Sequence, residues 1–259
     1  MDRKKLQALR EKVEAIALPA AKDRYGRSVG YEQEAQKALA AAATAAAGLL
    51  GKAKLVRGAA HQKKLVELAG KLKSTDHVFG HGLLEVPALH TARTMLLRTL
   101  KTIEAESRKV FIVHGRDEAM RLAVQGLLHQ VGLDDVVLSE ALNKGDTIIE
   151  KFDREARACG YAIVLCSPDD VGGLKAAGKA TPALAPRARQ NVILELGYFV
   201  ALLDRRHVFV LMAGSVEMPS DFSGVVYEGY DKAGAWKRRL ADELSAAGFY
   251  IDPAVRKKL

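Results

Sequence analysis

The chain changes character at residues 109–138, which read KVFIVHGRDEAMRLAVQGLLHQVGLDDVVL. Val110–Val113 is a short run of apolar, β-forming residues, and His114 with Gly115 ends it. Asp117 is suited to cap the helix that the following apolar residues predict by their helical spacing. A second strand is predicted at 136–138. A strand, a helix and a strand in this order predict two parallel strands joined by a crossover helix.

The same alternation continues toward the end of the chain. A turn at 143–146 precedes a predicted helix with apolar residues at 148, 149 and 152. Further strands are predicted at 161–165, 208–211 and 225–227, and further helices around residue 195 and over 236–247. We therefore predict an α/β fold with a parallel sheet that helices cover on both faces.

The sequence before residue 109 predicts helices and no strands. Apolar residues at helical spacing predict helices over 6–16, 33–50, 61–72 and 87–103, with a turn region at 73–86. We therefore divide the chain into an all-helical domain, residues 1–108, and an α/β domain, residues 109–259. The first part shows no enzyme motif, so we expect it to regulate or assemble the second.

The two parts differ in charge. The whole chain has a formal net charge of +9. Residues 1–109 hold 21 Lys and Arg against 11 Asp and Glu, a net of +10, and the remainder holds 19 against 20, a net of −1. A basic region of this kind attracts nucleic acid, an acidic partner or an anionic messenger. Because aromatic residues are not interleaved with the basic ones, a solvated helical face is favoured over specific nucleic-acid binding.

Composition narrows the class of protein. A hydrophobic content of 49% and a charged content of 27% are typical of a globular protein. The two cysteines, Cys159 and Cys166, fit neither a disulfide framework nor a zinc site. The sequence shows no signal-peptide pattern and no apolar run long enough to span a bilayer. We expect a cytoplasmic protein with no membrane partner.

Four segments are predicted to meet at the carboxyl edge of the sheet, where open α/β sheets bind ligands. They are His114–Asp117, 140–146, 167–173 and the start of the helix near 187. The stretch 167–186 is longer than a connection needs, which favours a lid or mobile segment. Asp169 and Asp170 resemble a metal pair, but adjacent carboxylates point apart. A turn is favoured there, and no metal site is predicted.

The stretch Arg187–Phe199, RARQNVILELGYF, holds the main candidate for chemistry. Residues three and four apart share a helix face, so Asn191, Glu195 and Tyr198 form a polar stripe on a largely apolar helix. A carboxylate with apolar neighbours loses hydration, so it must be paired with a cation, be protonated or serve in the chemistry of a site. In the alternative without a functional role, a core arginine or Tyr198 pairs with the Glu195 carboxylate. Arg187 and Arg189 stand where the helix begins, which suits a phosphate group.

Four motifs carry a resemblance to a known family: VFIVHGRDE at 110–118, SPDDVG at 167–172, RARQNVILELG at 187–197 and PSDFSGVV at 219–226. In this order they resemble the bacterial TIR-like domain of effectors in the CBASS and Pycsar antiphage systems. The resemblance covers roughly residues 109–251. It implies a flavodoxin-like fold and hydrolysis of NAD at the nicotinamide–ribose bond, with NAD as substrate and no further cofactor.

The resemblance also assigns roles to residues. Glu195 matches the family's catalytic glutamate, and residues 140–147 match its BB loop, through which such domains self-associate. Cleavage of an N-glycosidic bond passes through an oxocarbenium-like ribose, which a nearby carboxylate stabilises. Nicotinamide leaves without protonation, so one carboxylate suffices. The residues predicted to bind NAD are His114, Gly115, Arg116, Asp169, Asp170, Arg187, Arg189, Asn191 and Tyr198.

Two other readings stay open. A nucleoside deoxyribosyltransferase-like enzyme would use a similar sheet and a helix-borne glutamate as nucleophile. A non-catalytic TIR-like module would bind a nucleotide or another TIR domain without turnover. The resemblance does not extend to the helical domain, so its activator, a cyclic nucleotide or another signal, is not identified.

Overall fold

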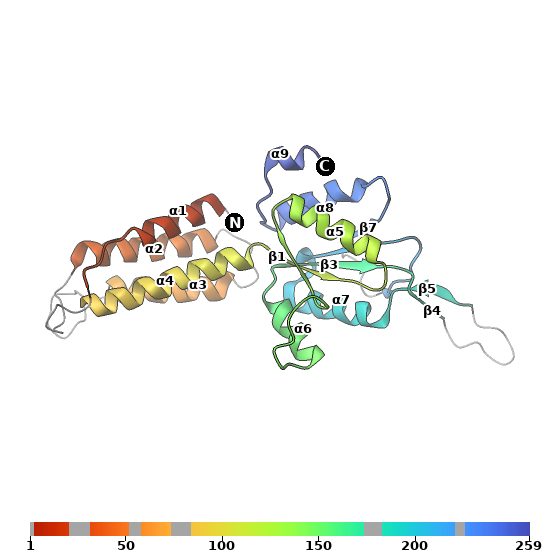
Figure 1. The fold of residues 1–259 in the computed structure, drawn as a ribbon, viewed down its shortest axis with the longest axis horizontal. Coiled ribbons are helices and arrows are strands. Elements are labelled where there is room, and N and C mark those ends of the chain that lie inside the picture. The colour runs from red at the N-terminus through yellow and green to blue at the C-terminus, as the bar shows by residue number, and fades with distance from the viewer. Residues whose placement is uncertain (1–2, 21–31, 52–57, 74–83, 174–182, 221–225) are drawn as a thin grey trace. The chain divides into compact units, whose positions relative to one another are not determined.

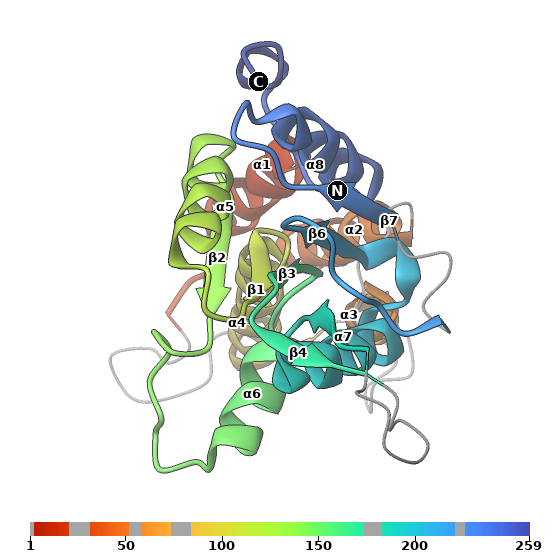
Figure 2. The same cartoon turned by 90° about the vertical axis from the view of Figure 1, so that its right-hand side faces the viewer.

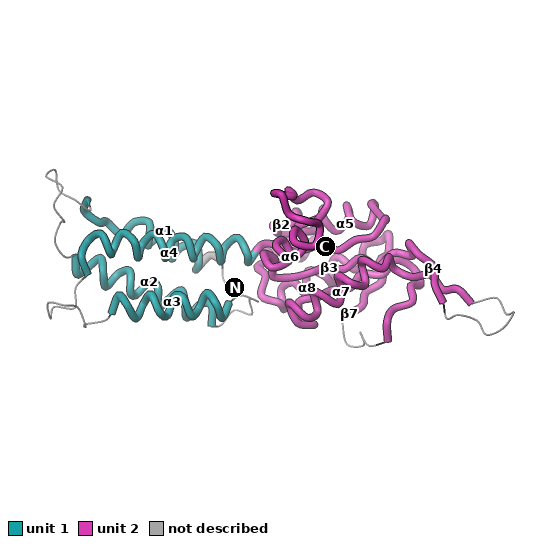
Figure 3. Tube along the Cα trace, turned by 90° about the horizontal axis from the view of Figure 1, so that it is seen from below, with its two compact units in different colours: residues 1–107 teal, residues 108–259 magenta. Residues whose placement is uncertain are grey.

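We describe a computed structural model of the chain over residues 3–20, 32–51, 58–73, 84–173, 183–220 and 226–259. The chain divides into two compact units, residues 1–107 and 108–259 (Figure 3). The turn region predicted at 73–86 lies mostly outside the described residues. The same holds for residues 174–182 of the predicted lid.

The first unit contains four helices in its described part: α1 (Arg3–Glu14), α2 (Gln33–Gly51), α3 (Gly58–Lys73) and α4 (Val86–Glu106). Alanines make up much of the buried face of α2, so it packs closely against its neighbours. Buried Gln36 ties two segments together. Its amide nitrogen donates to the Leu72 carbonyl at 2.8 Å, and its amide oxygen accepts from the Leu84 backbone at 2.7 Å.

The second unit is built on a five-stranded sheet in the order β2-β1-β3-β6-β7, in which all neighbouring strands are parallel. The strands are β1 (Lys109–Val113), β2 (Asp134–Val137), β3 (Tyr161–Cys166), β6 (Val208–Met212) and β7 (Val226–Gly229). The chain leaves β1 toward β2 on one side and continues with β3 on the other. The strand order therefore reverses between β1 and β3, which is where this kind of sheet opens a crevice for ligands.

Helices cover both faces of the sheet (Figures 1 and 2). One face packs against α5 (Glu118–Gln130) and α8 (Ala235–Ala246), and the other against α6 (Ile148–Arg157) and α7 (Gln190–Leu203). Alternate residues of β1 serve the two faces. Ile112 joins the core under α5 and α8, whereas the Phe111 ring meets Phe152 of α6 and Phe199 of α7 at 5.7 and 4.8 Å between centroids. Two short helical elements, η1 (Arg205–His207) and α9 (Pro253–Arg256), are also described.

Helix caps follow the sequence. The Asp117 carboxylate accepts from the Met120 backbone at 2.9 Å, as its position before α5 predicted. Thr147 and Glu150 form a reciprocal capping box at the start of α6. The predicted α/β fold with a helical region before residue 109 is confirmed.

One element was not predicted. The segment after β3 contains an antiparallel hairpin of β4 (Asp170–Gly172) and β5 (Ala185–Arg187), which extends from the sheet (Figure 1). Each strand has three residues, and Pro186 stands opposite Val171. Such short strands with glycine and proline show no recognisable alternation of apolar and polar residues, so the sequence indicated a loop there.

Candidate active site

The turn after β1 lies at the carboxyl edge of the sheet and depends on glycine. A Cβ atom added to Gly115 would lie 1.7 Å from Oδ2 of Asp169. The Arg116 backbone donates to the same oxygen at 2.8 Å, and the Ser167 hydroxyl donates to the other at 3.0 Å. Asp169 therefore holds the ends of β1 and β3 together, in addition to its predicted place at a binding site.

Next to this turn, α7 begins at the carboxyl edge and runs back along the sheet. Arg189 occupies the N-cap position, and no side chain caps the first turn of the helix. Arg187 precedes it in β5, where its Nε donates to Glu217 Oε2 at 2.7 Å. Within the described residues, Arg189 thus stands at a helix start whose first N–H groups have no side-chain cap, an arrangement suited to phosphate, and Arg187 lies two positions earlier.

Glu195 lies six residues after Arg189, nearly two turns into α7, and is half-buried. Within the described residues no side chain or backbone group hydrogen-bonds to its carboxylate. Burial raises the pKa of the Glu195 carboxyl to about 7, and the Arg189 guanidinium opposes the rise. A carboxyl group near neutrality exists in both forms at cellular pH, which is the state expected of a group that takes part in chemistry.

Tyr198 shares the helix face of Glu195, and it points toward α6. Its hydroxyl donates to the Asp153 carboxylate. Its ring meets Phe152 at 4.8 Å between centroids. Asn191, the third residue of the predicted stripe, is exposed in the first turn.

A cavity of about 960 Å³ opens on another flank of α7. Its lining combines charged and apolar residues: Pro168, Asp169, Asp170, Val171, Arg187, Ala188, Gln190, Ile193, Glu217, Met218 and Pro219. Ile193 and Glu195 are two positions apart on a helix and so point about 200° apart. Of the predicted site residues, Asp169, Asp170 and Arg187 therefore share this cavity, whereas Glu195 and Tyr198 face the side of α6.

The loop predicted to act in assembly is held by side chains of α6. Lys151 is buried and donates to Asn143 Oδ1 at 3.0 Å. Arg154 donates to the Leu142 carbonyl at 2.8 Å and pairs with Asp146. The tip turns through Lys144 and Gly145, both with positive φ.

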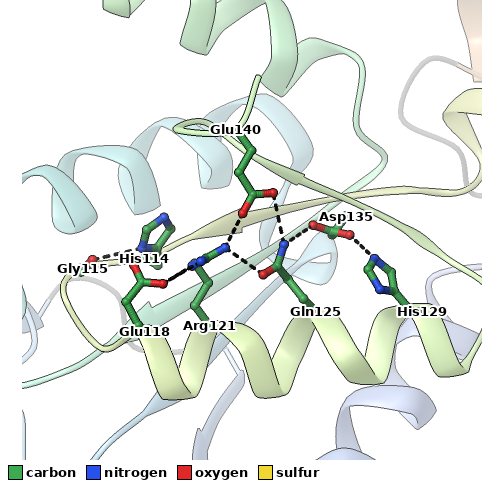
Figure 4. Close-up of polar contacts among 8 residues, drawn as sticks. All are labelled: His114, Gly115, Glu118, Arg121, Gln125, His129, Asp135 and Glu140. Carbon is green, nitrogen blue, oxygen red and sulfur yellow. Dashed lines mark hydrogen bonds and ion pairs between the residues drawn. The ribbon is translucent and has the colours of Figure 1, made fainter. Parts of the chain in front are cut away.

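A polar network that the sequence did not reveal fixes the start of this loop (Figure 4). Arg121 on α5 donates to Glu118, to Gln125 at 2.8 Å and to Glu140 at 2.5 Å. Gln125 continues the network to Asp135 at 2.6 Å. The helical spacing of 118, 121 and 125 was visible in the sequence, but the approach of Glu140 was not, because it depends on the tertiary fold.

Two further groups bear on the chemistry. Burial, with the Asp169 carboxylate nearby, raises the pKa of the Cys166 thiol to about 12, so this cysteine is no nucleophile near neutral pH. Within the described residues, no three His, Cys, Asp or Glu side chains are grouped so as to hold a metal ion. Nor does any helix there have the length and apolar character needed to cross a membrane.

Comparison with known proteins agrees with this geometry. Residues 109–232 match the family described as CAP12/Pycsar effector protein, TIR domain. This match lies within the second unit, residues 108–259, which is therefore similar to a TIR domain and is called the TIR unit below. The match covers the turn after β1, the loop before α6, the β4–β5 hairpin and the whole of α7.

Three relatives match between 32 and 56% of this chain. The chain is 45% identical over 146 residues to the protein YuaY of Escherichia coli (strain K12), covering 56% of this chain and 48% of that protein. It is 34% identical over 131 residues to tirC of Dictyostelium discoideum, covering 48% and 65%. It is 36% identical over 84 residues to the Pycsar effector protein PaPycTIR of Pseudomonas aeruginosa, covering 32% and 25%. The chain thus spans less than two thirds of each of these relatives.

Proposed function

We propose that the TIR domain hydrolyses NAD at the bond between nicotinamide and ribose, with Glu195 as the catalytic residue. The observation that carries the proposal is a half-buried carboxylate without a hydrogen-bonding partner among the described residues, placed near the carboxyl edge of the sheet. In its ionised form, a carboxylate without hydrogen-bond donors can place its charge against a cation that forms beside it.

The reaction needs little else from the protein. The bond from ribose C1′ to the pyridinium nitrogen breaks, its electron pair stays with nicotinamide, and a water oxygen bonds to C1′. The water loses one proton, so NAD and water give ADP-ribose, nicotinamide and H⁺. Ionised Glu195 stabilises the oxocarbenium-like ribose between these events and orients the water.

Binding of the substrate would use the start of α7. Its pyrophosphate carries negative charge, and Arg189 with the uncapped N–H groups of the first turn supplies donors. Arg187 stands close in sequence and lines the neighbouring cavity. We propose these two arginines as phosphate-binding residues, and His114, Gly115, Arg116, Asp169, Asp170 and Asn191 as further residues of the NAD site. Tyr198, the remaining residue of the predicted set, donates its hydroxyl to Asp153 instead.

We propose that activity depends on self-association of the TIR domain and that residues 1–108 receive the activating signal, a cyclic nucleotide or another ligand. Three apolar side chains around the loop support self-association: Leu142, Ile148 and Ile149 are 74, 81 and 62% exposed. Because the matching family is described as a Pycsar effector TIR domain and the relative PaPycTIR is named a Pycsar effector protein, we propose an antiphage effector.

The test is nicotinamide release from NAD by the purified protein over a series of protein concentrations. Wild type is compared with Glu195→Gln and with Glu67→Gln, a matched change at an exposed glutamate of α3. We expect release that rises more steeply than protein concentration, is unchanged in Glu67→Gln and falls at least about 100-fold in Glu195→Gln. Full turnover by folded Glu195→Gln would refute the proposal.

The same samples separate the alternatives. Exchange of bases between deoxynucleosides would identify a deoxyribosyltransferase-like enzyme. Retained NAD binding without any product, in every state of assembly, would identify a non-catalytic module.

A further inference from the structure

A side-chain hydrogen bond between α6 and α7 joins Tyr198 to Asp153. The Tyr198 hydroxyl donates to one Asp153 oxygen, and Arg157 donates through Nε to both oxygens, at 2.9 and 2.8 Å. Burial and the Asp153 carboxylate raise the pKa of the Tyr198 hydroxyl, so it keeps its proton at neutral pH. A neutral phenol therefore binds a carboxylate whose charge Arg157 balances.

The ring of Tyr198 is held independently of its hydroxyl. It packs edge-on against Phe152 at 4.8 Å and meets Phe199 at 5.8 Å between centroids. These rings continue to Phe111 in the centre of the sheet. Removal of the hydroxyl alone therefore breaks the link to Asp153 and leaves the ring in place.

Tyr198 stands one helical turn after Glu195. Side chains on a helix lean toward its N-terminus, so the Tyr198 ring covers the turn that carries Glu195. A phenol has a single O–H donor, and Tyr198 gives it to Asp153. The contact thus withholds the Tyr198 hydroxyl from Glu195 and ties the helix that carries Glu195 to α6.

The same helix α6 also holds the loop at 140–147. Lys151 and Arg154 contact Asn143, Leu142 and Asp146, and Asp153 lies between them in sequence. A displacement of the loop would therefore move the Asp153 carboxylate and, through Tyr198, the turn with Glu195.

We infer that Tyr198 and Asp153 form a positioning contact that fixes Glu195 relative to α6 and transmits the position of the loop to it. The inference rests on the proposed function of Glu195. Tyr198 is then a positioning residue, rather than a ring on which part of the substrate stacks.

The experiment is a double-mutant cycle on NAD turnover with Tyr198→Phe, Asp153→Ala and the double variant. Tyr250→Phe is the matched control, because Tyr250 is half-buried and makes no hydrogen bond among the described residues. We expect each single variant to lower kcat roughly tenfold with KM nearly unchanged, and the double variant to lose no more than the worse single one. Asp153→Asn keeps an acceptor for the hydroxyl and should recover part of the loss.

Several outcomes would overturn the inference. A wild-type kcat in Tyr198→Phe would do so, as would losses that multiply in the double variant or a rise in KM alone. A lower unfolding midpoint with unchanged kcat would show a purely structural contact.

The proposed function can fail separately. If Glu195→Gln keeps its NAD turnover, or if the wild type has none, hydrogen exchange tests whether the contact between Tyr198 and Asp153 fixes α7 to α6. Tyr198→Phe should then speed exchange of backbone amides in both α6 and α7, and unchanged exchange would overturn the inference.

Discussion

At Glu195 the stability of the fold and the proposed chemistry make opposite demands. Burial favours the protonated form, and it raises the pKa from the ordinary 4.5 to about 7. Below the unfolded pKa both states are protonated, and the group has no effect on stability. As pH rises past it toward 7, the unfolded state loses its proton first, so the folded state is progressively destabilised.

We therefore expect Glu195→Gln to be more stable than wild type at pH 8, by up to roughly 3 kcal/mol, because glutamine resembles the protonated acid. The difference should shrink toward zero near pH 4.5. Urea unfolding at a series of pH values measures it, with Glu67→Gln as the control that should show no such trend. A gain that is independent of pH would contradict this account.

Among single residues, those whose role follows from local spacing could be predicted. The stripe of Asn191, Glu195 and Tyr198 follows from the period of a helix, and so does the cap at Asp117. The partner of Tyr198 could not, because Asp153 lies 45 positions earlier in the chain. The same is true of Arg121 and Glu140, which meet only because α5 packs beside the end of β2.

At the scale of elements, the turn that connects β1 to α5 is constrained by its close contact with the end of β3. Gly115 lets the backbone pass against Asp169, and an added Cβ would lie inside that carboxylate. We expect Gly115→Ala to lower the free energy of unfolding by about 1–3 kcal/mol, since either the turn or the end of β3 must shift.

Gly126→Ala is a control for which the opposite change in the free energy of unfolding is expected. Gly126 lies exposed inside α5, and nothing approaches within 4 Å of an added Cβ. Gly126→Ala should therefore stabilise the protein by up to about 1 kcal/mol through helix propensity alone. Thermal unfolding of both variants gives the comparison, and equal effects would show that Gly115 is not constrained as described.

The order of elements could be predicted because β1, β3 and β6 are apolar runs and the longer helices have apolar faces. β3, for example, is buried along its whole length. The hairpin of β4 and β5 was missed for the opposite reason. Its backbone pairing is local and brief, and its outward residues include exposed Val171 and Leu184. Its arrangement beside Glu217 comes from the Arg187 ion pair, which no local pattern encodes.

At the scale of the whole molecule, the two units have separate interiors. One core gathers residues from α1 to α4, and the other gathers residues of the sheet with α5 and α8. Among the residues that the structure describes, none belongs to both cores. The charge is divided in the same way, since nearly all the positive excess lies before residue 110. A basic helical unit and a neutral TIR unit can therefore have different partners, as the proposed division into signal reception and NAD hydrolysis requires.

We accordingly expect residues 108–259 to fold without the helical unit. The expected result for this fragment is a single cooperative unfolding transition, because its core contains no residue of the first unit. Its backbone amide NMR resonances should overlay those of the same residues in the full chain, except near residue 108. An expanded state with secondary structure but no cooperative transition would contradict this, and would mean that the TIR unit depends on the helices for its fold as well as for control. If the fragment folds, its NAD turnover measured beside the full chain tells whether the helical unit activates or restrains Glu195.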